Sequence, residues 1–225
     1  MTKRQHINAE LDAQLGSLKE QILAMGRLVD AQVSEAVRAL VERDAEGARR
    51  LIDADRAVDQ MELAVDEQCI RLLALHQPAA SDLRFVAAAL KMVTDLERIG
   101  DLAVNMAERV QTLVEQPALP AVVDLPGLTA AAQGMLRDVL DAFVSGDTAK
   151  AEAVMAADAE IDARTARLIA EVEGEMGRAP GTLGRGLATI LFAKHIERMA
   201  DHTTNVAEMV VYLVRGQDVR HAKST

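Results

Sequence analysis

Two twelve-residue stretches of this chain carry the same acidic pattern 100 residues apart. The first runs from Glu97 to Glu108 and the second from Glu197 to Glu208. The residues shared at matching positions are Glu97/Glu197, Arg98/Arg198, Asp101/Asp201, Asn105/Asn205, Ala107/Ala207 and Glu108/Glu208. Because helical residues turn by about 100° each, the shared acidic residues and Asn fall on one side of a helix and the apolar residues on the other. Each stretch is therefore predicted to be an amphipathic helix with an acidic stripe.

An acidic stripe is most often a solvated helix face. Glu97 and Asp101, however, are like charges four residues apart, and Glu197 and Asp201 repeat that spacing. Such a pair destabilises a helix by about 0.2–0.5 kcal/mol. A bound cation would offset this repulsion, so both stripes are predicted to bind cations.

A second acidic pair in each half is predicted to face the first. Asp55 and Asp59 precede Pro78 by the same average distance as Glu97 and Asp101 follow it. In an antiparallel helix hairpin, residues equidistant from the turn lie at the same height. In the second half, the corresponding pairs Asp158/Asp162 and Glu197/Asp201 are centred on position 179.5, beside Pro180. The predicted metal ligands are Asp55, Asp59, Glu97 and Asp101, with Asp158, Asp162, Glu197 and Asp201.

Clustered carboxylates suit Mg, Mn, Ca, Fe or Zn, and no thiolate cluster narrows that choice. His202 adjoins Asp201 but is interpreted as a helix-surface histidine. The Glu-x-x-His pairs of di-iron bundles, a Ser/His/Asp arrangement and a Gly-rich phosphate loop are missing from the sequence. Residues that could orient ligands or bind partners are Glu62, Arg98, Asn105, Glu108, Arg198, Asn205 and Glu208.

Long helices must position these side chains. The five prolines are Pro78, Pro117, Pro120, Pro126 and Pro180, each interpreted as lying where a helix stops. The predicted helices cover residues 8–42, 44–76, 81–115, 128–144, 147–176 and 183–214, followed by a tail at 217–225. Asn8, Asp44, Ser81 and Asp147 are predicted N-caps, and Gly216 is a predicted C-terminal stop.

The predicted fold is all-α, with two tandem antiparallel three-helix bundles related by internal duplication. The first bundle is assigned to residues 1–116, a proline-rich linker to 117–127 and the second bundle to 128–225. Half of the 225 residues are apolar, which is enough for a substantial core. A single cysteine, Cys69, excludes a disulfide within the chain.

The formal net charge of −10 argues against a nucleic-acid backbone or an anionic membrane surface as a direct partner. The first residues lack the apolar core of a signal peptide, and no apolar run reaches membrane-spanning length. We therefore expect a cytoplasmic protein that is not inserted into the membrane. Cations and basic protein surfaces are the favoured partners.

Several motifs together resemble the PhoU family over nearly the whole chain. They are Met25-Gly26, Pro78-Ala79-Ala80-Ser81-Asp82-Leu83-Arg84, the two Glu-Arg-x-x-Asp blocks, and the run from Tyr212 to His221. The resemblance implies two similar three-helix bundles, frequent homodimers, and multinuclear iron or zinc clusters held by the paired acidic motifs. The second hairpin departs from the family pattern at Pro180-Gly181-Thr182-Leu183, so Arg84 has no secure counterpart.

The resemblance also implies a regulatory protein and not an enzyme. It would relay the state of the phosphate ABC transporter, through its ATPase, to the phosphate sensor histidine kinase, and so repress the phosphate regulon when phosphate is plentiful. A metal-dependent hydrolase is the alternative function, and a helical scaffold with solvated stripes is a third interpretation. The hydrolase would need an open coordination position and a substrate pocket beside the carboxylates.

The two halves are not equivalent. Glu62 and Asp66 extend the first acidic stripe, whereas their counterparts in the second half are Thr165 and Ile169. Counting from Pro78, Glu62 is predicted to lie level with Thr94, close to the first cluster. We therefore expect the first bundle to bind metal more tightly than the second.

Overall fold

The computed structural model describes residues 3–54, 56–78, 80–117 and 123–219. Over these residues the chain is helical, with no β-strand. The elements are α1 (Lys3–Glu42), α2 (Ala45–Asp53), α3 (Arg56–His76), α4 (Ser81–Val114), α5 (Leu125–Ser145), α6 (Thr148–Arg178), η1 (Pro180–Thr182) and α7 (Leu183–Arg215). The predicted all-α class is confirmed.

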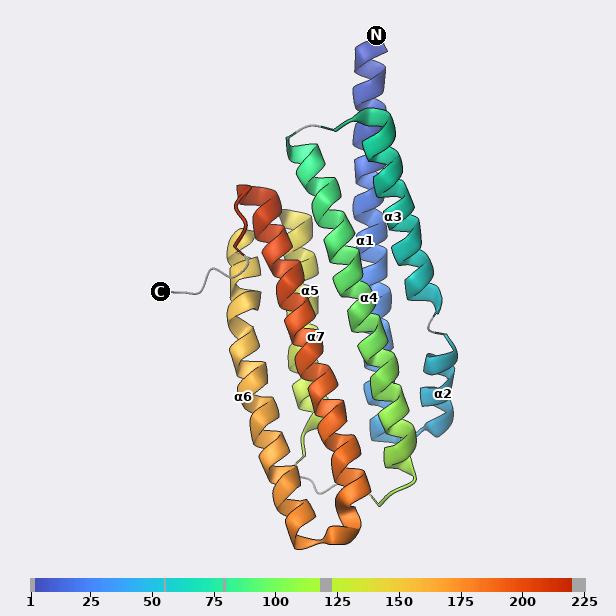
Figure 1. Cartoon of the computed structure of the whole chain (residues 1–225), viewed down its shortest axis with the longest axis vertical. Coiled ribbons are helices and arrows are strands. Elements are labelled where there is room, and N and C mark those ends of the chain that lie inside the picture. Colours follow the sequence, from blue (N-terminus) through green and yellow to red (C-terminus); the bar gives the residue numbers. More distant parts are fainter. Residues whose placement is uncertain (1–2, 55, 79, 118–122, 220–225) are drawn as a thin grey trace.

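The helices form two three-helix bundles that lie side by side (Figure 1). One bundle contains α1, α4 and the α2–α3 pair, and the other contains α5, α6 and α7. α4 packs along α7 in the antiparallel direction, and α1 packs on α5 behind them. The predicted tandem arrangement is therefore confirmed, with α4 and α7, the helices that carry the acidic stripes, at the centre.

One hydrophobic core runs through both bundles. Leu96, Ile99 and Met106 of α4 are fully buried, as are Phe192 and Ile196 of α7, and all belong to the same cluster. These apolar positions recur every three or four residues, which leaves the acidic side of each helix outside the core. None of the described helices has a stretch long and apolar enough to cross a membrane.

Side-chain caps fix two of the helix starts as predicted. Asp44 accepts a hydrogen bond from the Gly47 backbone N–H at 2.8 Å, and Asp147 accepts one from Lys150 N–H at 3.0 Å. Gly216 ends α7 with φ at 69°, a conformation that glycine adopts without steric cost.

Two predicted caps are wrong. α1 begins at Lys3, so Asn8 lies inside the helix. Ser81 is the first residue of α4, and Ala80 holds the N-cap position with φ at 49° and no side-chain cap. The long amphipathic pattern of α1 continues the helix through a residue type that favours helix starts, because packing outweighs local preference.

The predicted helix over 44–76 is divided. α2 ends at Asp53, and the N–H of the C-cap Ala54 closes onto the carbonyls of Arg50, Leu51 and Ile52. α3 begins at Arg56. α2 places Ala48 and Leu51 in the core and packs against α1 and α4 at an angle to α3 (Figure 1). No proline lies between 44 and 76 to mark the break, so it follows from packing and not from a local signal.

The second bundle starts earlier than predicted. α5 begins at Leu125, with Asp124 accepting from Gly127 N–H at 2.8 Å, and Pro126 lies in the first turn. Proline is tolerated there because the first helical N–H groups have no partner within the helix. The predicted linker over 117–127 therefore loses its last residues to α5, and residues 118–122 lie outside the described part of the chain.

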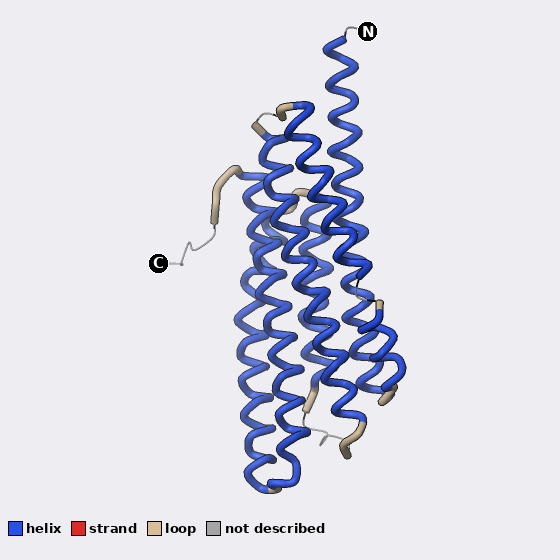
Figure 2. The backbone as a smooth tube through the Cα atoms, turned by 45° about the vertical axis from the view of Figure 1, so that its right-hand side comes forward, coloured by secondary structure: helices blue, strands red, loops and turns tan. Residues whose placement is uncertain are grey.

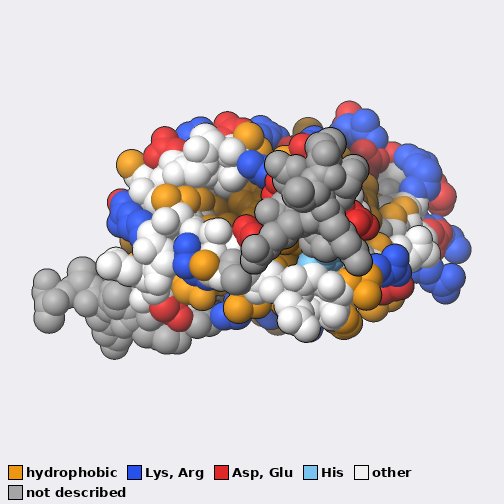
Figure 3. Space-filling view, turned by 90° about the horizontal axis from the view of Figure 1, so that it is seen from above, with side chains coloured by type: hydrophobic (Ala, Val, Ile, Leu, Met, Phe, Trp, Pro, Cys, Tyr) orange, Lys and Arg blue, Asp and Glu red, His pale blue; other side chains and the backbone are white. Residues whose placement is uncertain are grey.

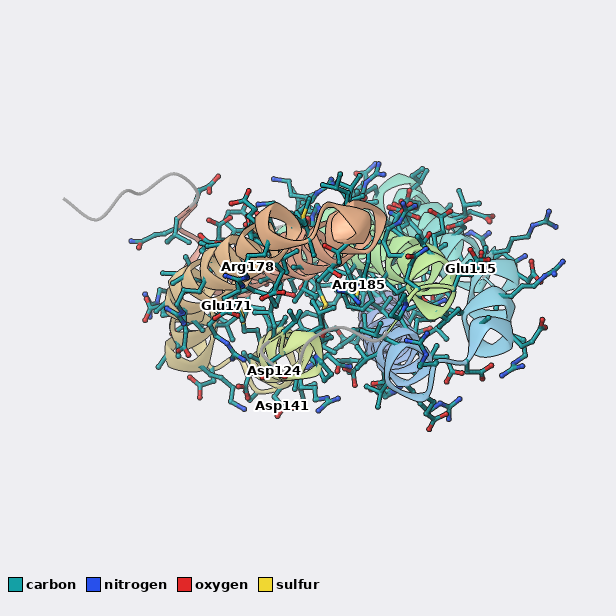
Figure 4. The ribbon with its side chains drawn as sticks, turned by 90° about the horizontal axis from the view of Figure 1, so that it is seen from below. Glu115, Asp124, Asp141, Glu171, Arg178 and Arg185 are labelled. Atoms are coloured by element: carbon teal, nitrogen blue, oxygen red, sulfur yellow. The ribbon has the colours of Figure 1, made fainter. Side chains whose placement is uncertain are left out.

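Arginines secure the chain where it passes from one bundle to the other. Arg43 Nη2 donates to the carbonyls of Val114 at 2.7 Å and Gln116 at 2.6 Å. Arg185 Nη1 donates to the Pro117 carbonyl at 3.1 Å. Figure 4, seen from this end, shows Arg185 near the start of α7. Arg43 thus fixes the end of α4, and Arg185 ties Pro117 to α7.

The opposite end of the molecule carries the C-terminal ends of α5 and α7, and α1 projects beyond it (Figure 2). Hydrophobic side chains show there between charged ones (Figure 3). Phe85 of α4 stacks on Phe143 of α5, with ring centroids 6.1 Å apart. This contact adds a second junction between the bundles.

Candidate metal centre

The first acidic cluster lies between α3 and α4. Asp59 is in the first turn of α3, and Glu97 and Asp101 are one turn apart in α4. One carboxylate oxygen of each lies within 4.8 Å of the others. Asp55, the fourth predicted ligand, lies outside the described residues. The hairpin thus brings together three of the predicted carboxylates.

The ionised form of Glu97 is disfavoured in this cluster. Burial raises the pKa of Glu97 to about 7, and the negative charges of Asp101 and Glu62 act in the same direction. Arg98 opposes them, with Nε 3.4 Å from Glu97 Oε2 and Nη1 3.4 Å from Asp101 Oδ2. A divalent cation would favour the ionised carboxylates far more strongly than one exposed arginine does.

Glu62 lies beside this cluster. Its Oε1 accepts a hydrogen bond from Thr94 Oγ1 at 3.1 Å, which confirms the predicted level of Glu62 on α3. Its charge contributes to the raised pKa of Glu97. The first cluster therefore has a further carboxylate within electrostatic reach.

The second cluster lies between α6 and α7. Burial raises the pKa of Asp158 to about 6, with further contributions from Asp201, Asp162 and Glu197 in that order. Burial and the charges of Asp162 and Glu197 also raise the pKa of Asp201. The four carboxylates therefore share one electrostatic environment, as predicted. Lys194, three residues before Glu197 in α7, forms an ion pair with that carboxylate.

The carboxylates of both clusters are ligands of the kind that a hard cation prefers, and those of the first lie within 4.8 Å of one another. Oδ1 of Asp158 is buried without a hydrogen-bond partner among the described residues, and such an atom is costly unless something satisfies it. Carboxylate oxygens are the ligands that Mg²⁺, Mn²⁺ and Fe ions accept, and Zn²⁺ also takes them. If metal binds, Asp59, Glu97 and Asp101 would hold it in the first bundle, and Asp158, Asp162, Glu197 and Asp201 in the second.

The accessory residues divide into two groups. Arg98 contacts the first cluster, and Glu62 lies beside it. Asn205 instead donates through Nδ2 to Asp95 Oδ1 at 2.9 Å, between the two bundles, so its predicted role near metal is not supported by its contacts. The other accessory residues lie on α4 and α7. Glu208 lines the groove between α4 and α7, and Glu108 pairs with Arg109 at 2.9 Å. Arg198 lies near His195, and Asn105 is half-buried on α4.

The sequence analysis did not identify two residues that contact the predicted site residues, Lys194 and Asp95. Lys194 precedes Glu197 by three residues, a spacing that brings side chains together on a helix and could have revealed the pair. Asp95 Oδ1 lies 2.9 Å from His202 Nδ1 as well as from Asn205. This contact crosses from α4 to α7, so only the packing of the two bundles reveals it.

One protein-family model matches both halves of the chain. The model described as "PhoU domain" matches residues 22–110 and again residues 126–210. The two matched segments contain most of α4 and most of α7, and with them both acidic clusters. The internal duplication is thus a repeat of one domain.

Relatives and solved structures agree with this match. The "Phosphate-specific transport system accessory protein PhoU homolog" of Pseudomonas putida is 41% identical over 96% of this chain and 85% of its own length. Its counterpart in Escherichia coli K12 is 36% identical over 96% of this chain and 90% of its own length. The crystal structure of PhoU from Pseudomonas aeruginosa superposes with a TM-score of 0.88 at 38% identity, covering 92% of this chain and 99% of that one. This chain therefore belongs to the PhoU family.

Proposed function

We propose that this chain is a metal-binding cytoplasmic regulator of phosphate uptake and of the phosphate-starvation response. It would couple the ATPase of a phosphate ABC transporter to a phosphate sensor histidine kinase and repress the phosphate regulon when phosphate is plentiful. The names of its relatives, which are accessory proteins of phosphate-specific transport, support the regulatory part of this proposal. It would act through protein contacts and not as an enzyme.

The observation that carries the metal-binding part is the grouping of Asp59, Glu97 and Asp101 within 4.8 Å. Three carboxylates so close repel one another in the absence of a cation, and the raised pKa of Glu97 expresses that repulsion together with burial. Iron or zinc is proposed as the native metal, with Mg and Mn as alternatives. The same reasoning extends to the second cluster through the raised pKa of Asp158.

A homodimer is part of the proposal. The outer side of α3 exposes large apolar side chains, with Leu63 at 66% and Ile70 at 64%. These two residues are seven positions apart and so lie on the same side of the helix. An apolar strip of this kind suits a contact between copies of the chain.

Deletion of the gene tests the regulatory proposal. Phosphate-starvation genes are expected to be expressed in phosphate-rich medium, and the wild-type chain supplied on a plasmid should restore repression. A reporter fused to a starvation promoter provides the measurement. Repression that persists in the deletion strain would contradict the proposal, and metal-stimulated phosphatase activity of the purified protein would favour the hydrolase instead.

Replacing Asp101 by Ala tests the first metal site. The variant is expected to lose the metal of the first bundle, because the remaining Asp59 and Glu97 offer fewer oxygen ligands. Its helicity should be preserved, since the Asp101 side chain is 38% exposed and leaves no cavity in the core. Elemental analysis of the purified protein measures the metal, and circular dichroism the helicity. Extensive unfolding would instead indicate a structural role for this carboxylate.

A further inference from the structure

The contact between α3 and α4 beside the first acidic cluster depends on a glycine. Gly100 lies in α4 directly before Asp101, and it is buried. A Cβ atom at position 100 would lie 3.2 Å from Cγ1 of Val58 and 3.4 Å from Oε1 of Gln32. Carbon atoms in contact normally lie about 3.5–4.0 Å apart. The backbone of α4 therefore approaches the first turn of α3 more closely than an alanine at this position would allow.

The two neighbours of Gly100 are confined. Val58 is 2% exposed and β-branched, so the surrounding core and its stiff χ1 angle hold its side chain in place. Gln32 of α1 is 6% exposed, and its Oε1 has no hydrogen-bond partner among the described residues. Close-packed interiors transmit strain instead of absorbing it. A methyl group at position 100 would therefore displace the first turn of α3 and not only the tips of side chains.

The first turn of α3 also carries one of the predicted metal ligands. Asp59 directly follows Val58, and its carboxylate lies within 4.8 Å of those of Glu97 and Asp101. Because neighbouring residues of a helix share one backbone, a shift of Val58 away from α4 carries Asp59 with it. Metal–ligand distances stay within about 0.2 Å of their usual values. A displacement of a few tenths of an ångström at one ligand is therefore enough to weaken a metal site.

The second bundle differs at the same place. Position 200, the repeat counterpart of Gly100, is alanine and is fully buried. A shift of 103 positions, which aligns the N-caps of α2 and α6, carries Val58 onto the larger Ile161. Within the described part of the second bundle, no three carboxylates reach the spacing found in the first cluster. The closer carboxylate grouping thus occurs in the half that has the glycine.

We propose that Gly100 is the positioning residue of the first metal site. By admitting the first turn of α3 against α4, it sets the distance from Asp59 to the two carboxylates of α4, and so the metal affinity of this bundle. Gly100 has no side chain that could bind a metal, so it acts only through the placement of Asp59. This role rests on the proposed metal-binding function.

The Zn²⁺ affinity of the full-length chain tests this role. Asp201→Ala serves as the parent, because its intact cluster is the first, and competition with a chromogenic chelator measures the affinity. Gly100→Ala in this parent is expected to weaken Zn²⁺ binding by about tenfold or more, which is typical when the support of a metal ligand is disturbed. Gly134→Ala is the matched control. It also lies within a helix, but a Cβ there meets nothing within 4 Å, so Zn²⁺ affinity should stay as in the parent.

Two further changes separate positioning from a general loss of stability. Val58→Ala removes the methyl groups that a Cβ at position 100 would meet, so Gly100→Ala combined with Val58→Ala should regain the Zn²⁺ affinity of the parent. Val65→Ala makes the same substitution at a fully buried site two turns further along α3. It should lower the melting temperature of the metal-free protein, because buried methyl groups are lost, yet leave Zn²⁺ affinity unchanged.

The proposed role of Gly100 is overturned if Gly100→Ala binds Zn²⁺ as the parent does, if Val58→Ala does not restore binding, or if Val65→Ala weakens binding as much as Gly100→Ala. Circular dichroism checks the folding of each variant. If Gly100→Ala alone does not fold, the double variant decides, and Zn²⁺ binding weaker than in the parent overturns the role. A parent that takes up no Zn²⁺ would contradict the proposed metal-binding function itself, and this role with it.

Discussion

Metal-free Glu97→Gln is expected to melt about 4–8 °C above metal-free wild type near ~pH 8. Burial, followed by the charge of Asp101, raises the pKa of Glu97 from 4.5 to about 7, so the ionised side chain destabilises the folded state there. At about 1.36 kcal/mol per pKa unit, and after allowance for solvent screening, removing the charge is worth on the order of 2 kcal/mol. Glutamine keeps the size of the side chain and adds no charge.

The raised pKa of Glu97 also predicts how the stability of the metal-free protein changes with pH. Between pH 4.5 and about 7 the folded state holds a proton on Glu97 that the unfolded state has lost, so stability falls as pH rises through this range. Asp158, with its pKa raised from 3.8 to about 6, acts with the same sign over a lower range. Metal-free wild type should therefore melt higher near ~pH 5.5 than near ~pH 8, and Glu97→Gln should reduce this difference.

Differential scanning fluorimetry in chelator over a pH series makes the measurement. Glu173→Gln, an exposed glutamate of α6 outside both clusters, is the matched control and should leave the melting temperature and its pH dependence as in wild type. Metal should raise the melting temperature of wild type at the higher pH and have a smaller effect on Glu97→Gln. A melting temperature for Glu97→Gln at or below that of wild type would show that the carboxylate stabilises the fold.

Features that depend on a few neighbouring residues were predictable from the sequence. The caps at Asp44 and Asp147 follow from short polar residues placed just before an apolar periodic run, and each accepts the expected backbone hydrogen bond. The level of Glu62 and Thr94 followed from counting residues from Pro78, because helix rise is regular. The same counting predicted the grouping of Asp59 with Glu97 and Asp101, and that of the second set of carboxylates across its hairpin.

Features set by packing between distant elements were not predictable. The break after Asp53 carries no proline, and α2 leaves the line of α3 because Ala48 and Leu51 pack into the core. Asn205 shared the acidic face of its helix in sequence, yet the bundle contact turns it toward Asp95. Helical periodicity indicates which side of a helix is polar, but it does not indicate which neighbouring helix will cover that side.

The structure supplies a physical reason to expect unequal metal affinity in the two bundles. Among the described residues, only Asp59, Glu97 and Asp101 bring three carboxylate oxygens within 4.8 Å of one another. Glu62 adds negative charge beside them. Its counterpart Thr165 is completely buried, and its neutral hydroxyl contributes no charge to the second cluster.

A further difference weakens the second cluster. Lys194 pairs with Glu197, and an ammonium group competes with metal for that carboxylate. The first cluster has its own competing cation, Arg98, but its two contacts are both 3.4 Å long and the arginine is 55% exposed. Metal should therefore displace Arg98 at little cost.

We accordingly expect Asp201→Ala, which retains the intact first site, to hold its metal against a chelator about 10–100-fold better than Asp101→Ala, which retains the second. This ratio is the typical effect of losing one carboxylate beside the metal ligands. Glu62 is such a carboxylate in the first bundle, whereas the second bundle has Thr165 in its place. Stepwise titration of each metal-loaded variant with a chelator, followed by elemental analysis, gives the two retention curves. Glu62→Gln in the Asp201→Ala background isolates the cause and should shift its curve toward that of Asp101→Ala. Equal curves, or faster loss from Asp201→Ala, would show that the charge of Glu62 does not set metal affinity, and the closer grouping of Asp59, Glu97 and Asp101 would then have no consequence for binding.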